Sequence, residues 1–474
     1  MAPPDDSARS FTEKNTSHSD LEAASSNSSA TRSSSDYAEG IRRITTTDET
    51  HPEHHKNILH KLHSTTRTIS RQQTTRTQKD LDAVLNTPFE VRFGGTDDME
   101  NPFNWTLLKR GYLLFLVSMQ TLVVIFYSTA YVSGSRGMME EFGITSSTTA
   151  ILGMTTYLLG LAAGPMFLAP LSEIYGRRPV FLVSLAGFFL LVIPACVAKN
   201  MTTILVVRFF GAFLGSVTIS NAPGTVGDIF DEDVRVMAFS WFAIAPMEGP
   251  VLGPVIGGFV YQSLGWRWNN WLVLILAGVF GLLSLTHPET YAPVLLRKRA
   301  ERLRAETGDE RYMSRFCYKE GEGAIGDLLK NSLQRPVMML FTEAICIFWA
   351  IYIAAIYGIL YLCFTAYPIV FSEIRGWGPG VSGLAFLGIG TGTLSALICE
   401  PLNHKIYLMH KVDPDTGKRP PEARLVFVLG ASILIPASIF WFAWTCVPVT
   451  THWIWPILSG FTYGTLPLTL YADP

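Results

Sequence analysis

The sequence predicts an all-α integral membrane protein. Hydrophobic residues make up 48% of the chain and charged residues only 16%, and the mean hydropathy is +0.26 although the amino-terminal part is polar. Beyond residue 108, about ten stretches are apolar over the roughly 20 residues that a helix needs to cross a hydrocarbon core. These expected spans lie at about 110–132, 147–169, 180–198, 202–222, 238–262, 269–286, 337–363, 381–399, 424–446 and 453–472.

Polarity divides the chain into four sections. Residues 1–107 are rich in Ser, Thr, Asp, Glu and Arg. We expect a disordered cytoplasmic tail there, because so little apolar surface cannot offset the entropy of ordering. Residues 108–286 predict a six-span bundle, and residues 287–336 a polar cytoplasmic linker. Residues 337–474 predict an incomplete second bundle of about four spans, so the architecture suggests a duplication.

Basic residues predict the orientation. They cluster before the first span, after the second and sixth spans, and between the eighth and ninth. By the positive-inside rule, the amino terminus, the linker and the carboxyl end are expected to be cytoplasmic. Residues 1–40 have no apolar core, so the first span is expected to act as an uncleaved insertion signal. We expect the plasma membrane, with a vacuolar membrane as the alternative.

The fifth span contains the string Gly-Pro-Val-Leu-Gly-Pro-Val-Ile-Gly-Gly. Three of its glycines recur at every fourth position and share one helix face, while its two prolines remove backbone donors and bend the helix. In lipid, a face of small residues lets another helix backbone approach closely. The string predicts either a packing surface used in transport or a purely structural kink. Its residues are Gly249, Pro250, Gly253, Pro254, Gly257 and Gly258.

Three charged residues of the expected spans are candidates for proton coupling, namely Arg208, Glu248 and Glu343. A charge at the bilayer centre costs roughly 2.5–3.5 kcal/mol on the insertion scale, so each one needs a function or a partner. Arg208 is expected to face a cavity or a carboxylate, since its guanidinium stays charged. Glu248, and Glu343 about two turns into the seventh span, are interpreted either as proton carriers or as carboxyls kept neutral by burial.

Five polar or aromatic residues of the expected spans are candidates for a substrate cavity. Amide groups and ring faces of this kind accept amphipathic or aromatic cations. An aromatic stripe in a membrane helix is also typical of ordinary packing, and this alternative stays open. The candidates are Gln120, Asn221, Tyr352, Tyr357 and Tyr361.

The loop after the second span reads Ala-Pro-Leu-Ser-Glu-Ile-Tyr-Gly-Arg-Arg. Its charged residues lie at expected cytoplasmic helix ends, where ion pairs form in one conformation and break in another. Two charged residues beside the next cytoplasmic loop offer partners. We interpret the cluster as a cytoplasmic gate or latch, formed by Glu173, Gly176, Arg177, Arg178, Asp228 and Arg235.

Enzymatic and metal-binding motifs are missing from the sequence. It lacks the ATP-binding Gly-x-x-x-x-Gly-Lys-Ser/Thr, His-Glu-x-x-His, Gly-x-Ser-x-Gly and zinc-ligand spacings. Five of the ten histidines lie between His51 and His63 of the tail, where a solvated polar stretch is favoured over a metal site because no cysteine accompanies them. We therefore expect no catalytic site, cofactor or metal, and the net charge of −2 suggests no nucleic-acid partner.

These motifs resemble those of the major facilitator superfamily. Residues 169–178 are similar to its loop signature Gly-x-Leu-Ala-Asp-x-x-Gly-Arg-Arg/Lys, with Ala169 and Glu173 replacing the first glycine and the aspartate. Residues 249–258 are similar to its antiporter signature, and Arg208 lies in a string similar to the arginine motif that the family associates with proton coupling.

Three further strings resemble the fungal drug:proton antiporters, polyamine exporters included. They are Ala-Pro-Leu-Ser-Glu-x-x-Gly-Arg-Arg-Pro at 169–179, Pro-Glu-Thr-Tyr at 288–291 and Pro-Glu-Ala-Arg-Leu at 421–425. The resemblance covers about residues 100–465 and departs at Glu248, where the family usually has a small or apolar residue.

The resemblance implies a monomeric carrier of twelve spans in two bundles, which opens alternately to each side of the membrane. It implies export of drugs, toxins, polyamines or metabolites in exchange for protons. A proton-coupled importer or facilitator is the alternative, and a non-transporting membrane protein is a second one. The family would add two further spans after Pro474, so the second bundle is expected to be incomplete as written.

A second face of small residues is present in the expected eighth span. Gly388, Gly392 and Ala396 follow one another at a spacing of four. We expect this face to pack across the bundle interface against the glycine face of residues 249–258.

Overall fold

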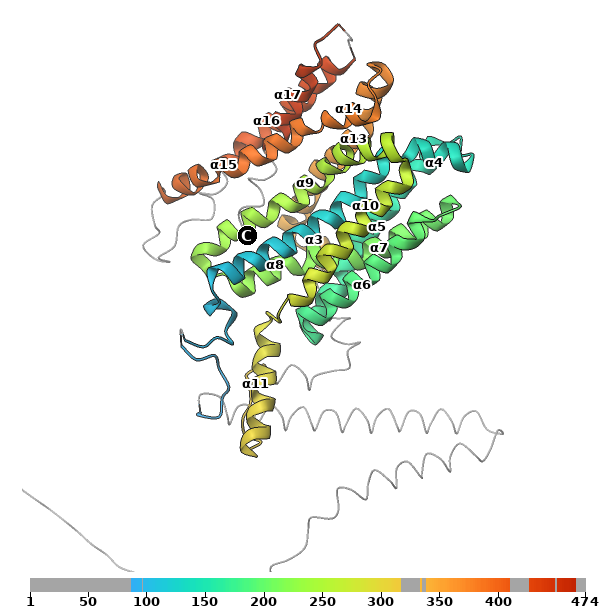
Figure 1. Ribbon diagram of the computed structural model, residues 1–474. Coiled ribbons are helices and arrows are strands. Elements are labelled where there is room, and N and C mark those ends of the chain that lie inside the picture. Colours follow the sequence, from blue (N-terminus) through green and yellow to red (C-terminus); the bar gives the residue numbers. More distant parts are fainter. Residues whose placement is uncertain are drawn as a thin grey trace, which may run out of the picture. The chain divides into compact units, whose positions relative to one another are not determined.

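The computed structural model describes residues 87–95, 97–316, 333–334, 338–409, 426–447 and 450–465, which all belong to one unit, Gln72–Pro474 (Figure 1). The remaining part of the expected tail, with its histidines, lies outside the described residues, as does most of the second half of the linker. The described residues are almost entirely helical, with a single isolated β-bridge between Glu90 and Met313 and no strand.

The first half contains the first six expected spans. The fourth of them is broken between two helices at Ser216. In chain order the elements are η1 (Pro102–Asn104), α3 (Leu107–Ser133), α4 (Ser135–Phe142), α5 (Ser147–Tyr175), α6 (Arg177–Cys196), α7 (Met201–Gly215), α8 (Val217–Ile229), α9 (Glu232–Leu264), α10 (Trp266–Leu283) and η2 (Ser284–Thr286).

Local sequence sets these helix boundaries. The side chains of Thr106 and Asn200 accept backbone hydrogen bonds at the starts of α3 and α7. Gly176 and Gly265 have φ values of +99° and +88°, a conformation that favours glycine. Each of them ends one span and lets the next begin at the following residue, so α5–α6 and α9–α10 are tight helical hairpins.

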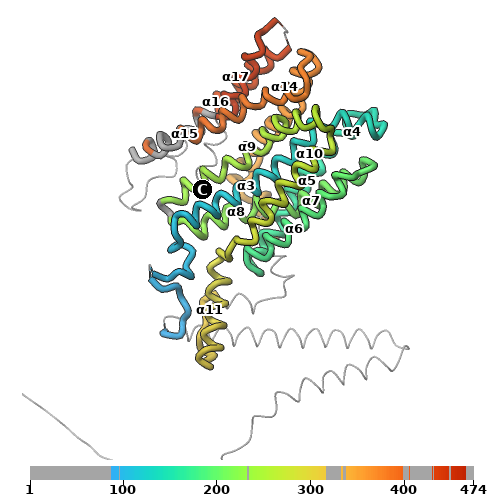
Figure 2. The backbone as a smooth tube through the Cα atoms, viewed as in Figure 1, coloured from blue at the N-terminus to red at the C-terminus, as the bar shows by residue number. Residues whose placement is uncertain are grey.

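The second half follows the linker helix α11 (Ala292–Thr307). Its elements are α13 (Ala344–Tyr367), η4 (Pro368–Ile374, a π-helical segment), α14 (Pro379–Leu384), α15 (Leu387–Met409), α16 (Val426–Cys446) and α17 (Ile454–Thr465). The tube in Figure 2 follows both halves through the chain. An aromatic cluster of the second half includes Phe364, Tyr367, Phe371 and Phe386. The ring centroids of Tyr367 and Phe386 lie 4.6 Å apart.

Hydropathy and length identify eight helical segments of the described chain that can cross a membrane. They coincide with the first eight expected spans, and α16 and α17 lie where the ninth and tenth were expected. The prediction of an all-α membrane protein with two helical bundles is thus confirmed.

Within the first half, glycines allow helix backbones to touch. A Cβ at Gly160 of α5 would lie 2.9 Å from Ala212 Cβ and would collide with the carbonyl oxygen of Phe209 on α7. The face of Gly249, Gly253 and Gly257 on α9 lies against α3. Gly249 meets Ile125 there, and Ala130 is a neighbour of both Gly253 and Gly257. Gly253 meets Thr129 there, and the Thr129 hydroxyl donates a 2.9 Å hydrogen bond to the carbonyl oxygen of Pro250.

The two halves meet along the other face of α9, which we call the seam. Gly258 lies against Pro379 and Gly380, and Gly383 lies against the carbonyl oxygen of Pro254. Farther along, a Cβ at Gly390 would be 2.9 Å from Val251 Cγ1. Ala396 shares a buried cluster with Ala243 and Met247.

The contacts at the seam differ from the expected packing of Gly388, Gly392 and Ala396 against residues 249–258. Gly388 and Gly392 face α17, at the carbonyl oxygens of Ile457 and Phe461, and only Ala396 of the expected second face contacts α9. Because α9 and α15 each carry small residues on two faces, the spacing of four alone did not identify the partner of either face.

Residues 87–95 and 97–106 also differ from the expected disorder. Val91 donates a 2.9 Å backbone hydrogen bond to Met313 and shares a buried cluster with Leu296 and Ala300 of α11. Asp98 forms a 2.5 Å ion pair with Arg299. Buried apolar residues of α11 are therefore covered by this stretch of the protein itself.

The glycine contacts predict a stability difference between two equivalent substitutions. Gly160→Ala places its methyl group against the backbone of α7 and is expected to destabilise the fold by about 1–3 kcal/mol through overpacking. Gly281→Ala on α10 has no neighbour within 4 Å and should be neutral or slightly stabilising, since alanine favours helix. Thermal unfolding of the two purified variants in detergent checks this, and equal melting temperatures would contradict it.

Candidate functional site

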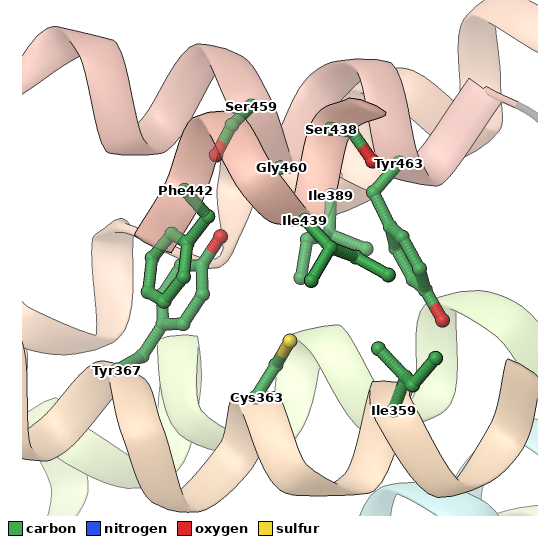
Figure 3. Close-up of a pocket in the computed structure, with 10 residues that line it drawn as sticks. All are labelled: Ile359, Cys363, Tyr367, Ile389, Ser438, Ile439, Phe442, Ser459, Gly460 and Tyr463. Atoms are coloured by element: carbon green, nitrogen blue, oxygen red, sulfur yellow. The ribbon is translucent and has the colours of Figure 1, made fainter. Parts of the chain in front are cut away.

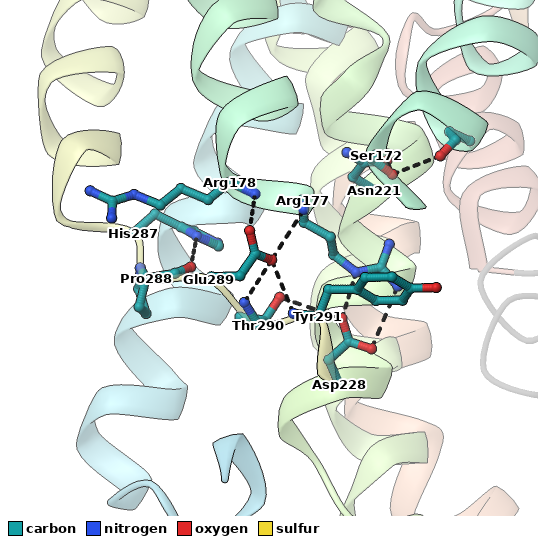
Figure 4. A network of polar contacts seen from close by, with 11 residues as sticks. Ser172, Arg177, Arg178, Asn221, Asp228, His287, Pro288, Glu289, Thr290 and Tyr291 are labelled. Atoms are coloured by element: carbon teal, nitrogen blue, oxygen red, sulfur yellow. Dashed lines mark hydrogen bonds and ion pairs between the residues drawn. The ribbon is translucent and has the colours of Figure 1, made fainter. Parts of the chain in front are cut away.

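One end of the first half carries a network of polar contacts around Glu289 (Figure 4). The Glu289 carboxylate accepts hydrogen bonds from the backbone N–H groups of Arg177 and Arg178, at 3.1 and 3.2 Å. These are the first residues of α6, so the carboxylate satisfies free donors at a helix N-terminus, where negative charge is favoured. A Cβ at Gly176 would lie 2.5 Å from Glu289 Oε2, which explains why glycine stands at this position.

Arg177 joins three elements in the same network. Its Nε lies 2.5 Å from Asp228 Oδ2 at the end of α8, and both side chains are largely buried. Its guanidinium lies over the ring of Tyr291, 5.0 Å from the centroid. The hydroxyl of Thr290 donates a 3.4 Å hydrogen bond to Asp228 Oδ2. We call the set Arg177, Arg178, Asp228, Glu289 and Thr290 the latch.

Two charged members of the expected latch lie outside it. Glu173 is exposed and forms no ion pair within the described chain. Arg235 donates a 3.2 Å hydrogen bond to the backbone oxygen of Phe230 and thus fastens the turn between α8 and α9. Helix-end charges predicted the pair of Arg177 and Asp228, but nearness in sequence did not show which other charges join it.

His287 lies just after the sixth span and supports the latch. Its ring stacks on Phe181 with centroids 5.6 Å apart, and Nδ1 lies 2.7 Å from the backbone oxygen of Pro288. Nε2 is buried without a hydrogen-bond partner. Burial lowers the pKa of His287, against a raising effect from Pro288 and Glu289.

Arg208 is almost fully buried, at 1% exposure, in the middle of the first half. Its guanidinium carbon lies 4.3–4.7 Å from the ring centroids of Tyr127, Tyr131 and Tyr157. The side chain donates hydrogen bonds to the backbone oxygens of Gly153, Tyr127 and Ser128, at 2.8, 3.2 and 3.2 Å.

This environment corrects the expectation of a carboxylate partner for Arg208. Aromatic faces and carbonyl dipoles stabilise a desolvated cation, so the described residues supply counter-dipoles instead of a counter-charge. Arg208 thereby ties α7 to α3 and α5. Its remaining nitrogen, Nη1, is buried without a hydrogen-bond partner.

The two candidate carboxyls are placed differently. Glu248 lies at the seam, 8% exposed, and its Oε1 is buried without a hydrogen-bond partner. Oε2 faces α15, where a Cβ at Gly390 would be 2.8 Å away. Glu343 is exposed and lies between residues 338–342, which are helical, and α13, which begins at Ala344. The structure therefore does not bring Glu343 and Glu248 together.

The cavity candidates also separate into two groups. Gln120 donates a 3.0 Å hydrogen bond to the backbone oxygen of Phe280 and also bonds Ser284, so it fastens α3 to α10. Asn221 accepts a 3.0 Å hydrogen bond from Ser172. Both amides are buried between helices of the first half, and their place in a substrate cavity stays a prediction.

Two of the three tyrosines of α13, Tyr357 and Tyr361, contact the first half. The Tyr361 hydroxyl is 3.3 Å from Ser128 Oγ on α3, a contact between the two halves. Tyr357 packs against the cluster of Ala243, Met247 and Ala396. Tyr352 stacks on Phe348, and its hydroxyl is buried without a hydrogen-bond partner.

A pocket lies inside the second half (Figure 3). Its volume is about 40 Å³, which is room for a few water molecules and not for an organic substrate. It is lined by Ile359, Cys363, Tyr367, Ile389, Ser438, Ile439, Phe442, Ser459, Gly460 and Tyr463. None of these residues belongs to the expected cavity.

Sequence reasoning missed Glu289 and Ser128 as contact residues. Glu289 acts through backbone groups more than a hundred residues away, which no local pattern reveals. Its Pro-Glu-Thr-Tyr string was a usable signal, because the acidic residue follows a span whose end meets the Gly-Arg-Arg turn. Ser128 carries no charge and gave no such signal.

The sequence profile described as Major Facilitator Superfamily matches residues 113–472. The chain therefore belongs to this family of membrane transporters. It is 42% identical over 369 residues to the MFS-type efflux pump MFS2 of Trichophyton rubrum, covering 77% of this chain and 61% of that one. It is also 42% identical over 378 residues to the major facilitator superfamily multidrug transporter mdrA of Aspergillus fumigatus, covering 80% of this chain and 61% of mdrA.

These coverages show that the chain spans less than two thirds of the length of either relative. Among solved structures, the proton:xylose symporter XylE bound to 6-bromo-6-deoxy-D-glucose superimposes with a TM-score of 0.53. The alignment has 14% sequence identity and covers 78% of this chain and 81% of XylE. At this identity the likeness shows the shared transporter fold alone.

The latch predicts a stability contribution from Glu289. Glu289→Gln weakens charge-assisted hydrogen bonds to the N-terminus of α6 and is expected to cost about 1.5–3 kcal/mol. Glu301→Gln, on the exposed side of α11, removes the same charge without touching α6 and should leave stability nearly unchanged. Thermal unfolding compares them, and equal small effects would argue against helix capping by Glu289.

His287 predicts a pH dependence of stability. Its pKa is lowered in the folded protein, so the unfolded chain binds more protons below its ordinary pKa of about 6.5. The stability is fully present above that pH and is lost as the pH falls toward the folded-state pKa. The wild type should therefore lose more thermal stability between pH 7.5 and 5.5 than His287→Phe, which keeps the stacking on Phe181. Equal losses in the two proteins would contradict the prediction.

Proposed function

We propose that this chain forms a transporter that exports small organic compounds in exchange for protons by alternating access. The observation that carries the proposal is the seam, where two helical halves touch through backbone and small side chains. Such surfaces slide or rock with little repacking, which a carrier with two facing states requires. Drugs, toxins, polyamines and metabolites are all within the proposed substrate class.

Three further features support this function. The relatives named above are called an efflux pump and a multidrug transporter, which favours export. The latch joins helices at the end of the first half where basic residues predict the cytoplasm, a suitable place for a gate. Glu248, buried at the seam, is the candidate proton carrier that the geometry favours over Arg208 and Glu343.

The same proposal includes the arrangement in the cell. A cytoplasmic amino terminus, a linker at about 287–336 and a monomer in the plasma membrane suit an exporter whose two bundles move against each other. One proton crossing 100 mV supplies about 2.3 kcal/mol, and each pH unit adds about 1.36 kcal/mol. Together they sustain a several-hundred-fold gradient of a neutral compound.

Accumulation of a fluorescent cationic drug in cells that express this chain tests the proposal. Expressing cells should accumulate less drug than empty cells, and a protonophore should abolish the difference. Higher accumulation would favour the importer alternative. An unchanged level, with the protein confirmed in the membrane, would contradict transport and favour the non-transporting alternative.

The latch gives a matched pair of variants for the same assay. Asp228→Asn removes the ionic partner of Arg177 and is expected to shift the gate equilibrium by roughly ten- to hundredfold, the equivalent of a charged hydrogen bond of about 1.5–3 kcal/mol. Asp309→Asn breaks an exposed pair with Arg311 in the linker and should leave drug export unchanged. Equal export by both variants would exclude a gating role for the latch.

A further inference from the structure

We propose that Glu248 is a proton-binding site that controls the seam: the neutral carboxyl lets α9 and α15 pack together, and its ionisation separates them. This inference rests on the proposed alternation between two states. It assigns to one proton a defined structural effect, which is closure of the contact between Glu248 and Gly390.

The position of Glu248 is the first argument. It follows Met247, which packs against Ala396, and it precedes by one helical turn Val251, which packs against the aromatic cluster of the second half. The carboxyl therefore lies inside the contact between the halves. A Cβ at Gly390 would be 2.8 Å from Oε2, so glycine leaves just enough space for the carboxyl in the closed seam.

The missing partner is the second argument. Glu248 is more than nine-tenths buried, and Oε1 has no hydrogen-bond partner. An ionised carboxylate in such a place loses its hydration without compensation, and this costs several kilocalories per mole. A neutral carboxyl avoids most of that cost, so the closed seam is compatible with the protonated form. Separation of α9 from α15 admits water, which solvates the carboxylate after the proton has left.

The neighbouring ionisable groups do not replace Glu248 as the proton-binding group of the seam. On α13, Tyr357 packs against the cluster next to Glu248, and Tyr361 bonds Ser128 of α3. Phenols are ordinarily neutral between pH 5 and 8. Arg208 is held among three tyrosines and the backbone of α3 and α5, without an ion pair to Glu248. Among the described residues, Glu248 is thus the group at the seam whose charge can change in this range.

A proton fits this site better than a metal ion or an organic cation. The described residues contain no group of three or more metal-ligating side chains. The close approach of Gly390 and Val251 leaves no room beside the carboxyl for a larger ligand. Proton binding needs no space, since it adds only one O–H bond to an oxygen already in place.

The seam reaches the end of α9 that lies opposite the latch, where the Gln262 side chain accepts a 3.2 Å hydrogen bond from the Gly380 backbone. With the latch on the cytoplasmic side, a closed seam shuts the outer side. A proton taken up from outside then favours the state that is open to the cytoplasm. Release of that proton into the cytoplasm favours the return to the state that is open to the outside. This is the order of steps that exchange of a proton for an exported compound requires.

Pulsed electron paramagnetic resonance on the full chain in proteoliposomes tests the proposal. Nitroxide labels at Leu264→Cys and Val381→Cys, both exposed and on opposite sides of the seam, report its separation in a background without native cysteines. From pH 5 to pH 8 the label distance should shift from a short to a long population. The ratio of the long to the short population should change by up to about tenfold per pH unit if one proton is bound.

Two variants and a control make the result specific. Glu248→Gln should remain in the short population at every pH. Gly390→Ala, whose methyl group displaces the carboxyl, should shift toward the long population at low pH. Glu173→Gln, an exposed carboxyl away from the seam, should keep the wild-type response. A pH-independent distance in the wild type, or the same pH response in Glu248→Gln, would overturn the proposal.

Drug transport by the same proteoliposomes separates this inference from the proposed function. Proton-driven transport without a pH-dependent distance would refute the role of Glu248 alone. A pH-dependent distance that Glu248→Gln abolishes would support the role of Glu248, even in a chain that moves none of the drugs tested.

Discussion

Close approach between helix backbones is the constraint on which the rest of this structure depends. Helix α9 has small residues on two faces, so it touches α3 on one side and the second half on the other. In a membrane no hydrophobic force favours helix association over contact with lipid, and tight van der Waals contact has to supply it. The glycines and prolines of residues 249–258 thus determine the packing of the first half and the contact between the halves.

Two charged side chains of the first half are held mainly by peptide groups and rings. Arg208 lies among tyrosine faces and carbonyl oxygens, and Glu289 accepts hydrogen bonds from the first N–H groups of α6. The peptide groups among these partners are fixed by the helices themselves and cost no side-chain entropy to place. Glu248 is the exception, since nothing in the described chain compensates its charge. The contrast between Arg208 and Glu248 distinguishes a structural ion from a group whose protonation state matters.

The sequence was sufficient for the helical membrane class and for the span positions, because span length and hydropathy are local properties. It also revealed the pair of Arg177 and Asp228 through their places at helix ends. It did not reveal the partners of a helix face: Gln120 and Asn221 are polar, yet they fasten helices within the first half.

The stretch before the first span has a consequence for the reach of the linker. Residues 89–100 and α11 are joined by backbone pairing, an apolar cluster and the ion pairs of Asp98 and Glu100 with Arg299 and Arg302. The linker is therefore fastened to the first half well beyond the end of the sixth span. In a movement of one half against the other, α11 and the chain as far as Phe316 would therefore travel with the first half.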